Sequence, residues 1–343
     1  MRIGIVLALV AVLSTVSPGV SGACACGAFV ANEKLQAQQE TALVELTGRT
    51  EAITVSVHAR SDAAQAAFLM PVPARARFEV GDVGVFAELD RISRPEVRTR
   101  RVVVDGDGTG GAPPQGGATV VDHVEVGPYE VAQLSGDDSS AVQQWLDEHG
   151  FTLSAALGGA LTPYLAEDWL VVAVRLAPSS GSLADGLPPV RVVFETDEPV
   201  YPMRLSATAQ GVQPLRLYVL ADHRVDVGNP APKGRDPELT FAGPVDESAD
   251  HPALSALLTG PRFLTRYDAE FRPDFIENDI KITRSATDDH HRAVVVVTEY
   301  VHSDWSWILW VLGGLLSAVV VFVVVRRRRA LAVSMRSNTS STP

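Results

Sequence analysis

Residues 42–70, ALVELTGRTEAITVSVHARSDAAQAAFLM, decide the fold of this chain. Residues 43–46 are mostly apolar, and apolar side chains occupy alternate positions in residues 52–58. Residues 67–70 form a third apolar segment, which ends at Pro71. A repeat of two residues is typical of a β-strand that buries one face and exposes the other. We therefore expect an antiparallel meander in this part of the chain.

Short helices interrupt the strands. An apolar stripe predicts a helix within residues 83–92, and Ser139 or Ser140 begins a second helix that ends at Gly150. A third helix is expected from residue 154 toward residue 167, interrupted at Pro163. Further strands are expected over residues 119–126, 129–134, 169–176, 190–195, 215–220 and 293–301.

The overall pattern is that of an α+β domain. Residues 225–252 are rich in Pro, Gly and Asp, which indicates an extended excursion or linker. Residues 23–304 therefore form either one domain or two subdomains. The expected fold class is α+β, a strand-dominated extracytoplasmic domain with a few short helices, followed by one C-terminal transmembrane helix.

Residues 1–22 have the pattern of a signal peptide. Arg2 precedes an apolar run over residues 3–16, and the small residues 20–22 stand where signal peptidase cleaves. This predicts a mature chain that begins at Ala23. In a second interpretation, residues 21–23 form a lipidation box and Cys24 is acylated.

Residues 305–325 are an uncharged run of 21 residues. A helix of this length, at about 1.5 Å per residue, matches a hydrocarbon core of about 30 Å. Tryptophans begin the run and arginines follow it, so the expected anchor residues are Trp305, Trp307, Trp310, Arg326, Arg327, Arg328 and Arg329. We expect a single-pass protein of the cell membrane with a cytoplasmic tail over residues 326–343. Its N-terminal domain would lie in the periplasm or at the cell surface, and membrane lipid would contact the helix.

The charge is distributed unevenly. Six of the 29 basic residues lie in the two terminal segments, and none of the 41 acidic residues do. Residues 23–304 therefore carry 23 basic and 41 acidic side chains, a net charge of −18. A surface of this sign repels phosphate groups, so we expect no nucleic acid partner, and any partner bound by electrostatic attraction should be cationic or bridged by cations.

No motif identifies a catalytic, metal or cofactor site. Residues 106–111 fit the G-x-G-x-x-G pattern, but Ala112-Pro113-Pro114 follows where a dinucleotide-binding helix should begin. Residues 288–291, Asp-Asp-His-His, could bind a divalent metal ion together with His302, which is near in the sequence. Adjacent residues of a strand point to opposite faces, so the two histidines would not easily share one ion. A polar turn therefore explains this segment better than a metal site. His223 has no recognisable nucleophile to activate. We expect no cofactor.

Cys24 and Cys26 are the two cysteines of the chain. In an exported protein they would meet an oxidising compartment, so a disulfide between them is one interpretation. The ring that such a disulfide closes is very small and would stabilise the fold little. Copper binding, disulfide exchange with a partner, or lipidation of Cys24 would equally account for this pair of thiols.

Several segments, in order along the chain, resemble one bacterial family. They are ACGAF at 25–29, FLMPVP at 68–73, VGPY at 126–129, WL at 145–146 before GF at 150–151, YPMRL at 201–205 and LYVLADHR at 217–224. The resemblance is to the uncharacterised bacterial domain-of-unknown-function family 2330. It implies a signal, an ectodomain that opens with Ala-Cys-Gly, and a C-terminal helix, but no assigned reaction. The family often has a second glycine and a later cysteine where this chain has Ala28 and Val30, so the resemblance carries over no disulfide partner for Cys26.

Two hypotheses of function follow. The first is a non-enzymatic envelope domain that binds another envelope protein or polymer. The second is an exported hydrolase or thiol-dependent enzyme whose site is assembled from dispersed residues. A pocket with converging His, Asp and Arg side chains of perturbed pKa would favour the enzyme, and a flat apolar patch would favour the binding protein.

Overall fold

The computed structural model describes residues 20–24, 26–32, 36–37, 39–56, 59–60, 63, 65–104, 129–177, 188–302 and 306–337. The chain divides into two compact units, which we describe separately. The first unit comprises residues 1–96 and 121–294, and the second comprises residues 97–120 and 295–343.

An eight-stranded sheet is the largest element of the first unit. Its strands, in spatial order, are β19 (His291–Arg292), β16 (Glu238–Val245), β17 (Arg262–Phe271), β14 (Gln213–Ala221), β4 (Glu40–Thr47), β5 (Thr50–Ser56), β12 (Val190–Glu195) and β8 (Arg77–Val80). Strands β4 and β14 are parallel, and the other neighbours in this sheet are antiparallel.

A five-stranded antiparallel sheet is the second large element. Its order is β1 (Val20–Cys24), β2 (Gly27–Ala31), β7 (Ala66–Val72), β11 (Leu170–Leu176) and β10 (Tyr129–Leu134). A small sheet contains β13 (Val200–Tyr201), β18 (Ile280–Arg284) and β15 (Val225–Val227), and β3 (Gln36–Ala37) pairs with β6 (Ala59–Arg60).

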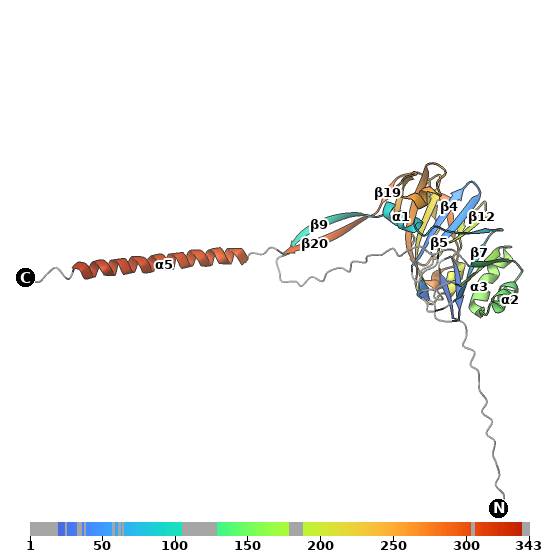
Figure 1. The fold of residues 1–343 in the computed structure, drawn as a ribbon, viewed down its shortest axis with the longest axis horizontal. Coiled ribbons are helices and arrows are strands. Elements are labelled where there is room, and N and C mark those ends of the chain that lie inside the picture. Colours follow the sequence, from blue (N-terminus) through green and yellow to red (C-terminus); the bar gives the residue numbers. More distant parts are fainter. Residues whose placement is uncertain are drawn as a thin grey trace, which may run out of the picture. The chain divides into compact units, whose positions relative to one another are not determined.

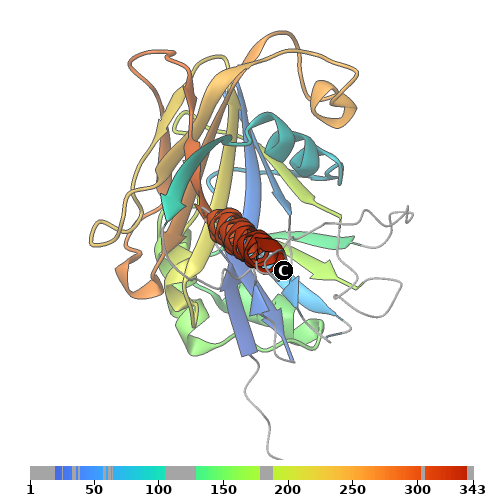
Figure 2. The same cartoon turned by 90° about the vertical axis from the view of Figure 1, so that its left-hand side faces the viewer.

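The two large sheets pack face to face, with helices on both outer faces. Phe29 and Phe68 of the five-stranded sheet share one core with Ile53 and Phe194 of the eight-stranded sheet. Helices α2 (Ser140–Glu148) and α3 (Ala155–Ala166) pack on the other face of the five-stranded sheet. Helices α1 (Val85–Ile92) and α4 (Pro252–Ser255) pack on the outer face of the eight-stranded sheet. Figures 1 and 2 show α1 (cyan) and the green helices on opposite sides of the strands.

This layering corrects the expected meander. Strands β4 and β5 pair antiparallel, as expected, but β7 belongs to the other large sheet. All seven residues of β7 are buried, and β5 is almost as fully buried. The prediction of one wet face was wrong because helices cover the outer faces of both sheets, so these strands are buried on both sides.

Two further predictions need correction. Residues 225–252 are not a linker, because they contain β15 and β16, and β16 lies one strand in from the edge of the large sheet. Its Phe241 and Ala242 are buried despite the Gly and Pro residues around them. Pro163 does not interrupt α3, which continues to Ala166. Pro163 has no N–H to donate to the carbonyl of Gly159. Both residues are exposed, so water can solvate that carbonyl.

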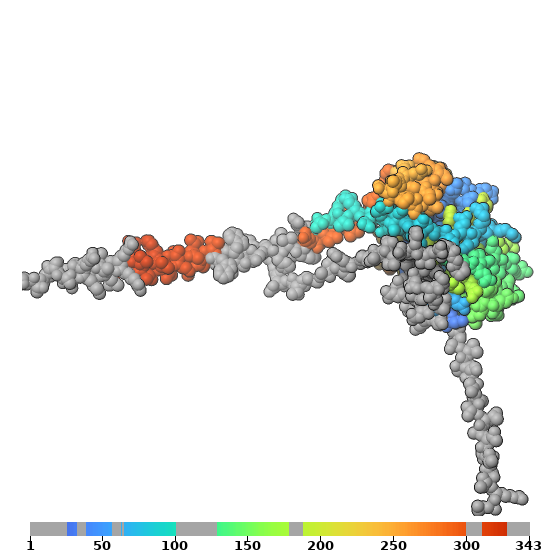
Figure 3. All heavy atoms as spheres, in the orientation of Figure 1, coloured from blue at the N-terminus to red at the C-terminus, as the bar shows by residue number. Residues whose placement is uncertain are grey.

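The second unit contains α5 (Ser306–Ser337) and all but the first residue of each of β9 (Glu96–Val104) and β20 (Val294–His302). Strands β9 and β20 pair into a two-stranded ribbon, drawn in cyan and orange in Figure 3. The four consecutive valines 294–297 are exposed on it. The strand expected over residues 293–301 is therefore present, although the described residues around it bury little of its apolar surface.

The prediction of a transmembrane helix over residues 305–325 was wrong. Among the described residues, no helix is long and apolar enough to cross a membrane. Helix α5 starts at Ser306 and continues through the arginines 326–329 to Ser337, so the uncharged run is one part of a longer helix that also carries charge.

Several expectations lie wholly or partly outside the described residues. These are the apolar leader over residues 3–16, the loop over residues 106–117, the strand over residues 119–126, and Trp305. Residues 20–22, assigned above to the end of the signal peptide, form part of β1 and pair with Phe29–Ala31 of β2. Cleavage before Ala23 stays a prediction.

Gly27 begins β2 at a point where the backbone approaches its neighbour closely. A Cβ atom added to Gly27 would lie 2.4 Å from the carbonyl oxygen of Leu69 and 2.8 Å from the ring of Phe68. The backbone oxygen belongs to the central strand β7 and cannot move away cheaply. Glycine in the Ala-Cys-Gly opening is therefore required by packing.

We predict that Gly27→Ala destabilises the fold by about 1–3 kcal/mol because it overpacks a closed site. The melting temperature should fall by about 2–4 °C for each kcal/mol. Gly211→Ala is the matched control, since a Cβ at Gly211 has no atom within 4 Å. Equal melting temperatures for both variants, measured by circular dichroism, would contradict this account of Gly27.

Candidate functional site

The C-terminal end of α3 supplies one side of the candidate site. The helix buries Tyr164 and ends at Glu167. Asp168 adopts a left-handed conformation with φ of 62°, and the next N–H, that of Trp169, donates to the Tyr164 carbonyl at 3.0 Å. This turn closes the helix end and brings the Trp169 ring to 4.9 Å from the Tyr164 ring.

The small sheet supplies the other side. Strands β13 and β18 are antiparallel, with Val200 opposite Lys281 and Tyr201 opposite Ile280. Asp279 immediately precedes β18, whereas the short 3-10 helix η2 (Arg204–Thr208) follows β13 by two residues. The strand register therefore places the Asp279 carboxylate at the beginning of η2.

Arg204 connects the two sides through charged hydrogen bonds. Its Nη1 and Nη2 donate to the two carboxylate oxygens of Glu167 at 2.7 and 3.0 Å, and its Nε donates to Asp279 Oδ2 at 2.9 Å. Its guanidinium lies 3.8 Å from the centroid of the Tyr164 ring and 5.8 Å from that of Trp169. We call these five residues the Arg204 cluster.

Asp279 is the most heavily bonded member of the Arg204 cluster. Its Oδ1 accepts from the Met203 N–H at 2.6 Å, from the Arg204 N–H at 3.1 Å, and from the Tyr164 hydroxyl. Its side chain is 10% exposed, and that of Arg204 is 19% exposed. Charges this far removed from water are stable only when paired and hydrogen-bonded, as these are.

The cluster fixes the protonation states of its members. The hydrogen bonds from Arg204 lower the pKa of the Glu167 carboxyl. Burial, with the neighbouring Asp279 charge, raises the pKa of the Tyr164 hydroxyl well above its usual range. Burial also acts to lower the pKa of Arg204, but the paired carboxylates outweigh it and raise that pKa. Glu167 is therefore ionised at neutral pH, Tyr164 keeps its proton, and Arg204 stays charged.

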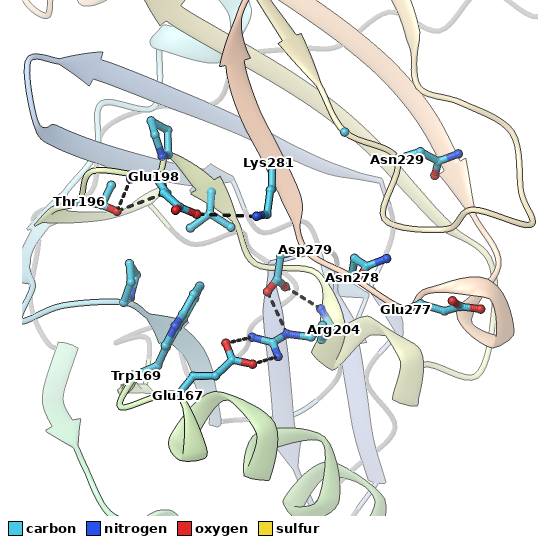
Figure 4. Close-up of a pocket in the computed structure, with 14 residues that line it drawn as sticks. Glu167, Trp169, Thr196, Glu198, Arg204, Asn229, Glu277, Asn278, Asp279 and Lys281 are labelled. Atoms are coloured by element: carbon cyan, nitrogen blue, oxygen red, sulfur yellow. Dashed lines mark hydrogen bonds and ion pairs between the residues drawn. The ribbon is translucent and has the colours of Figure 1, made fainter.

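A pocket of about 620 Å³ opens beside the Arg204 cluster. Figure 4 shows Trp169, Glu167, Arg204 and Asp279 along one side, with Glu198 and Lys281 pointing toward each other along the other. The pocket lining also includes Pro73, Thr196, Pro199, Val200, Gly228, Asn229, Glu277 and Asn278. Its volume lies within the usual range of about 300–1,000 Å³ for small-molecule sites.

A buried carboxyl group lies directly behind the pocket wall. Glu51 of β5 is completely buried, and its Oε2 accepts from the N–H of the pocket-lining Val200 at 3.1 Å. The described structure gives Oε1 no hydrogen-bond partner. Burial raises the pKa of Glu51 to about 8, so the carboxyl is neutral at pH 7.

The two cysteines occupy a tight turn between β1 and β2. Cys24 pairs with Gly27 across the hairpin, and its side chain is outside the described set. The Cys26 side chain is 1% exposed, and its backbone N–H donates to Glu40 Oε1 at 2.8 Å. The buried Tyr201 hydroxyl donates to the same oxygen, so Cys26 belongs to a sealed polar cluster in the core.

A model of one protein family, described as "Uncharacterized protein conserved in bacteria (DUF2330)", matches residues 20–283. The chain belongs to this family. The resemblance drawn from the quoted segments is therefore confirmed. No curated protein matches the chain. Among solved structures, the crystal structure of baculovirus P35 is similar to this DUF2330 protein, with 10% sequence identity and a TM-score of 0.37 over 74% of this chain and 98% of that chain.

The structure joins two motifs that the sequence showed separately. The Arg224 N–H donates to Asp288 Oδ1 at 2.9 Å, and His223 Nδ1 lies 3.7 Å from Asp288 Oδ2. These two contacts connect the exposed Asp288 to the residues that follow β14. Within the described residues, no group of three or more His, Cys, Asp and Glu side chains is arranged to hold a metal ion.

The anchor residues and the Arg204 cluster differ in how well the sequence identified them. Trp307 and Trp310 lie in α5 with Arg326, Arg327, Arg328 and Arg329, and Arg326 and Arg327 are exposed. In the Arg204 cluster, only Arg204 lay in a segment that the sequence singled out, YPMRL at 201–205. Trp169 and Glu167 were assigned only to element ends, and Asp279 gave no signal.

We predict that Asp279→Asn lowers the free energy of unfolding by about 2–3 kcal/mol because it removes the charge that pairs with Arg204. The melting temperature should fall by about 2–4 °C for each kcal/mol. Asp274→Asn breaks an exposed pair with Arg272 at 2.7 Å and should cost less than about 1 kcal/mol. If both variants melt alike, Asp279 does not organise the site.

We predict that Glu51 makes stability fall as pH rises. The folded pKa of about 8 exceeds the value of 4.5 in the unfolded chain, so the folded state holds an extra proton between these values. The stabilisation present below pH 4.5 is lost by about pH 8, a change on the order of 4 kcal/mol. Denaturant titrations of the wild type and Glu51→Gln at pH 5 and pH 8.5 measure it. If the free energies of unfolding of the two proteins differ by the same amount at both pH values, the prediction is refuted. Glu247→Gln, at an exposed site, is the control.

Proposed function

We propose that this chain is a non-enzymatic binding protein of the bacterial cell envelope, and that its ligand site is the pocket beside the Arg204 cluster. One observation carries the proposal: the charged side chains that line the pocket pair with one another. Arg204 bonds to Glu167 and Asp279, and Lys281 lies 3.7 Å from Glu198, whereas Glu277 pairs at 2.7 Å with Lys233, which is not part of the lining. The Arg204 side of this wall is preformed, because Arg204 and Asp279 are largely buried and hydrogen-bonded, and this favours binding without rearrangement there.

The same pairing argues against acid–base catalysis in the pocket. A general acid or base works best when its pKa lies near the working pH. The pKa of Glu167 is lowered by Arg204, and Tyr164 is held protonated. Glu51 has a pKa of about 8, but it is completely buried and cannot contact a ligand.

A thiol-dependent enzyme gains no support from Cys26. A reactive cysteine needs an accessible thiolate in an electropositive setting. Cys26 is buried beside Glu40 and Tyr201, so no substrate can reach its sulfur without local unfolding.

An envelope location is supported by the sequence. The apolar run at residues 3–16 has the pattern of an export signal. The net charge of −18 over residues 23–304 disfavours nucleic acids and other polyanions as partners. A polymer or a protein of the envelope fits these limits.

The proposal predicts ligand contact at the pocket in intact cells. A photoreactive residue at Asn278, which is exposed on the pocket rim, should form a crosslinked adduct with an envelope component. The adduct should decrease at least tenfold with Trp169→Ala, in a variant that circular dichroism shows to be folded at the temperature of the experiment. The control position is Val83, which is 69% exposed and is not among the residues that line this pocket. Equal adducts at both positions, or none at Asn278, would refute the proposal.

A further inference from the structure

The chemistry of the pocket limits the class of ligand. The N–H groups of Met203 and Arg204, at the start of η2, are the backbone donors that an anion would seek. Asp279 Oδ1 already accepts from both of them. The position that a phosphate or carboxylate would take is therefore filled by a side chain of the same charge.

The described part of the pocket wall gives an extended peptide no strand to pair with. Strand β13 has two residues, and its Val200 N–H donates to the buried Glu51. The Pro199 carbonyl accepts from the Ile282 N–H at 3.0 Å. The β-strand addition by which many proteins bind peptides needs a run of unpaired backbone groups, and this wall does not provide one.

A cationic ligand would have to displace cations that are already present. The carboxylates of the lining, namely Glu167, Glu198, Glu277 and Asp279, lie against Arg204, Lys281 and Lys233. The lining itself has four negative and two positive groups, a net charge of −2, and Lys233 offsets one of these charges from outside the lining. An incoming amine gains little because these pairs are mostly at the exposed rim, where ion pairs contribute at most about 1 kcal/mol.

Trp169 provides the main apolar surface of the pocket. It is half-buried, and its ring is held by Tyr164 at 4.9 Å and by Arg204 at 5.8 Å. Pro73, Pro199 and Val200 extend the apolar surface along the lining. A fixed indole ring favours a flat ligand that presents weakly positive C–H groups to its face.

Hydrogen-bonding groups surround this apolar surface. The described residues give the Asn278 side-chain amide no hydrogen-bond partner, and it is exposed at the rim. Glu198 and Lys281 stand 3.7 Å apart, beyond hydrogen-bond distance, so both retain bonding capacity. The rim thus offers an amide, a carboxylate and an ammonium group to ligand hydroxyls.

We infer that the ligand is a neutral saccharide, bound with one sugar ring against Trp169 and its hydroxyls on the polar rim. A pyranose ring has a face of C–H groups and an edge of hydroxyl groups, which matches an indole face within a ring of polar side chains. The inference rests on the proposed function and names the ligand class of the same pocket. An uncharged chain of sugars also avoids repulsion by the acidic domain.

The test is calorimetric titration of the full chain with soluble oligosaccharides of glucose and of N-acetylglucosamine. At least one neutral oligosaccharide should bind, with an affinity that changes less than about twofold between roughly 50 and 500 mM NaCl, because no net charge is neutralised. Trp169→Phe should weaken binding a few-fold and Trp169→Ala at least tenfold. Trp145→Phe, in the buried layer of α2, is the matched control and should leave the affinity unchanged.

Charged comparison ligands complete the test. Tighter binding of oligolysine or oligogalacturonate, with an affinity that falls steeply with salt, would overturn the saccharide inference, as would no binding by either neutral series. If the Asn278 crosslink in cells persists in that case, the pocket binds another class of ligand and the proposed function stands. If the crosslink is also absent, the proposed function fails with the inference.

Discussion

Asp279 organises the candidate site because it accepts hydrogen bonds from two separate segments at once. One carboxylate accepts from the end of α3 through Tyr164, from the start of η2 through two backbone N–H groups, and from the Arg204 side chain. A charge with so little exposure is stable only with all of these partners present. The position of Trp169 depends on it in turn, since Arg204 and Tyr164 both contact that ring. The side of the pocket formed by the Arg204 cluster is therefore held in place as a consequence of charge burial.

The four-layer arrangement explains why polar residues occur deep in the strands. Helices pack on both outer faces and the two sheets pack on each other, so several charged residues of β5 and β17 are buried. The side chains of Arg262 and Arg266 on β17 are each 4% exposed and bond to protein groups instead. Arg266 donates to Asp268 at 2.7 Å and to Ser93 at 3.0 Å, which ties β17 to the end of α1. Glu51 has a single backbone donor and remains neutral, because a lone buried carboxylate would be too costly.

Local patterns were enough to predict those elements whose residues carry a regular repeat. Helices α1 and α2 and strand β10 lie where the sequence placed them. Strands β16 and β17 were missed because Gly, Pro and Arg residues interrupt their apolar runs, and only partners distant in sequence make those residues compatible with burial. The Arg204 cluster was missed for the same reason. Its members come from residues 164–169, 204 and 279, and the strand register that unites them has no local signal.

A wall of mutually paired charges also determines what kind of selectivity the pocket can have. Groups that neutralise one another add little net attraction, but their fixed directions penalise any ligand whose hydroxyls or amides do not match them. Affinity must then come chiefly from contact with Trp169 and the prolines, and specificity from the polar rim. The acidic surface outside the pocket acts on a longer range and excludes polyanions before they reach it. Selection of a neutral ligand is thus shared between an acidic surface that repels anions and a pocket whose described carboxylates already lie against cations.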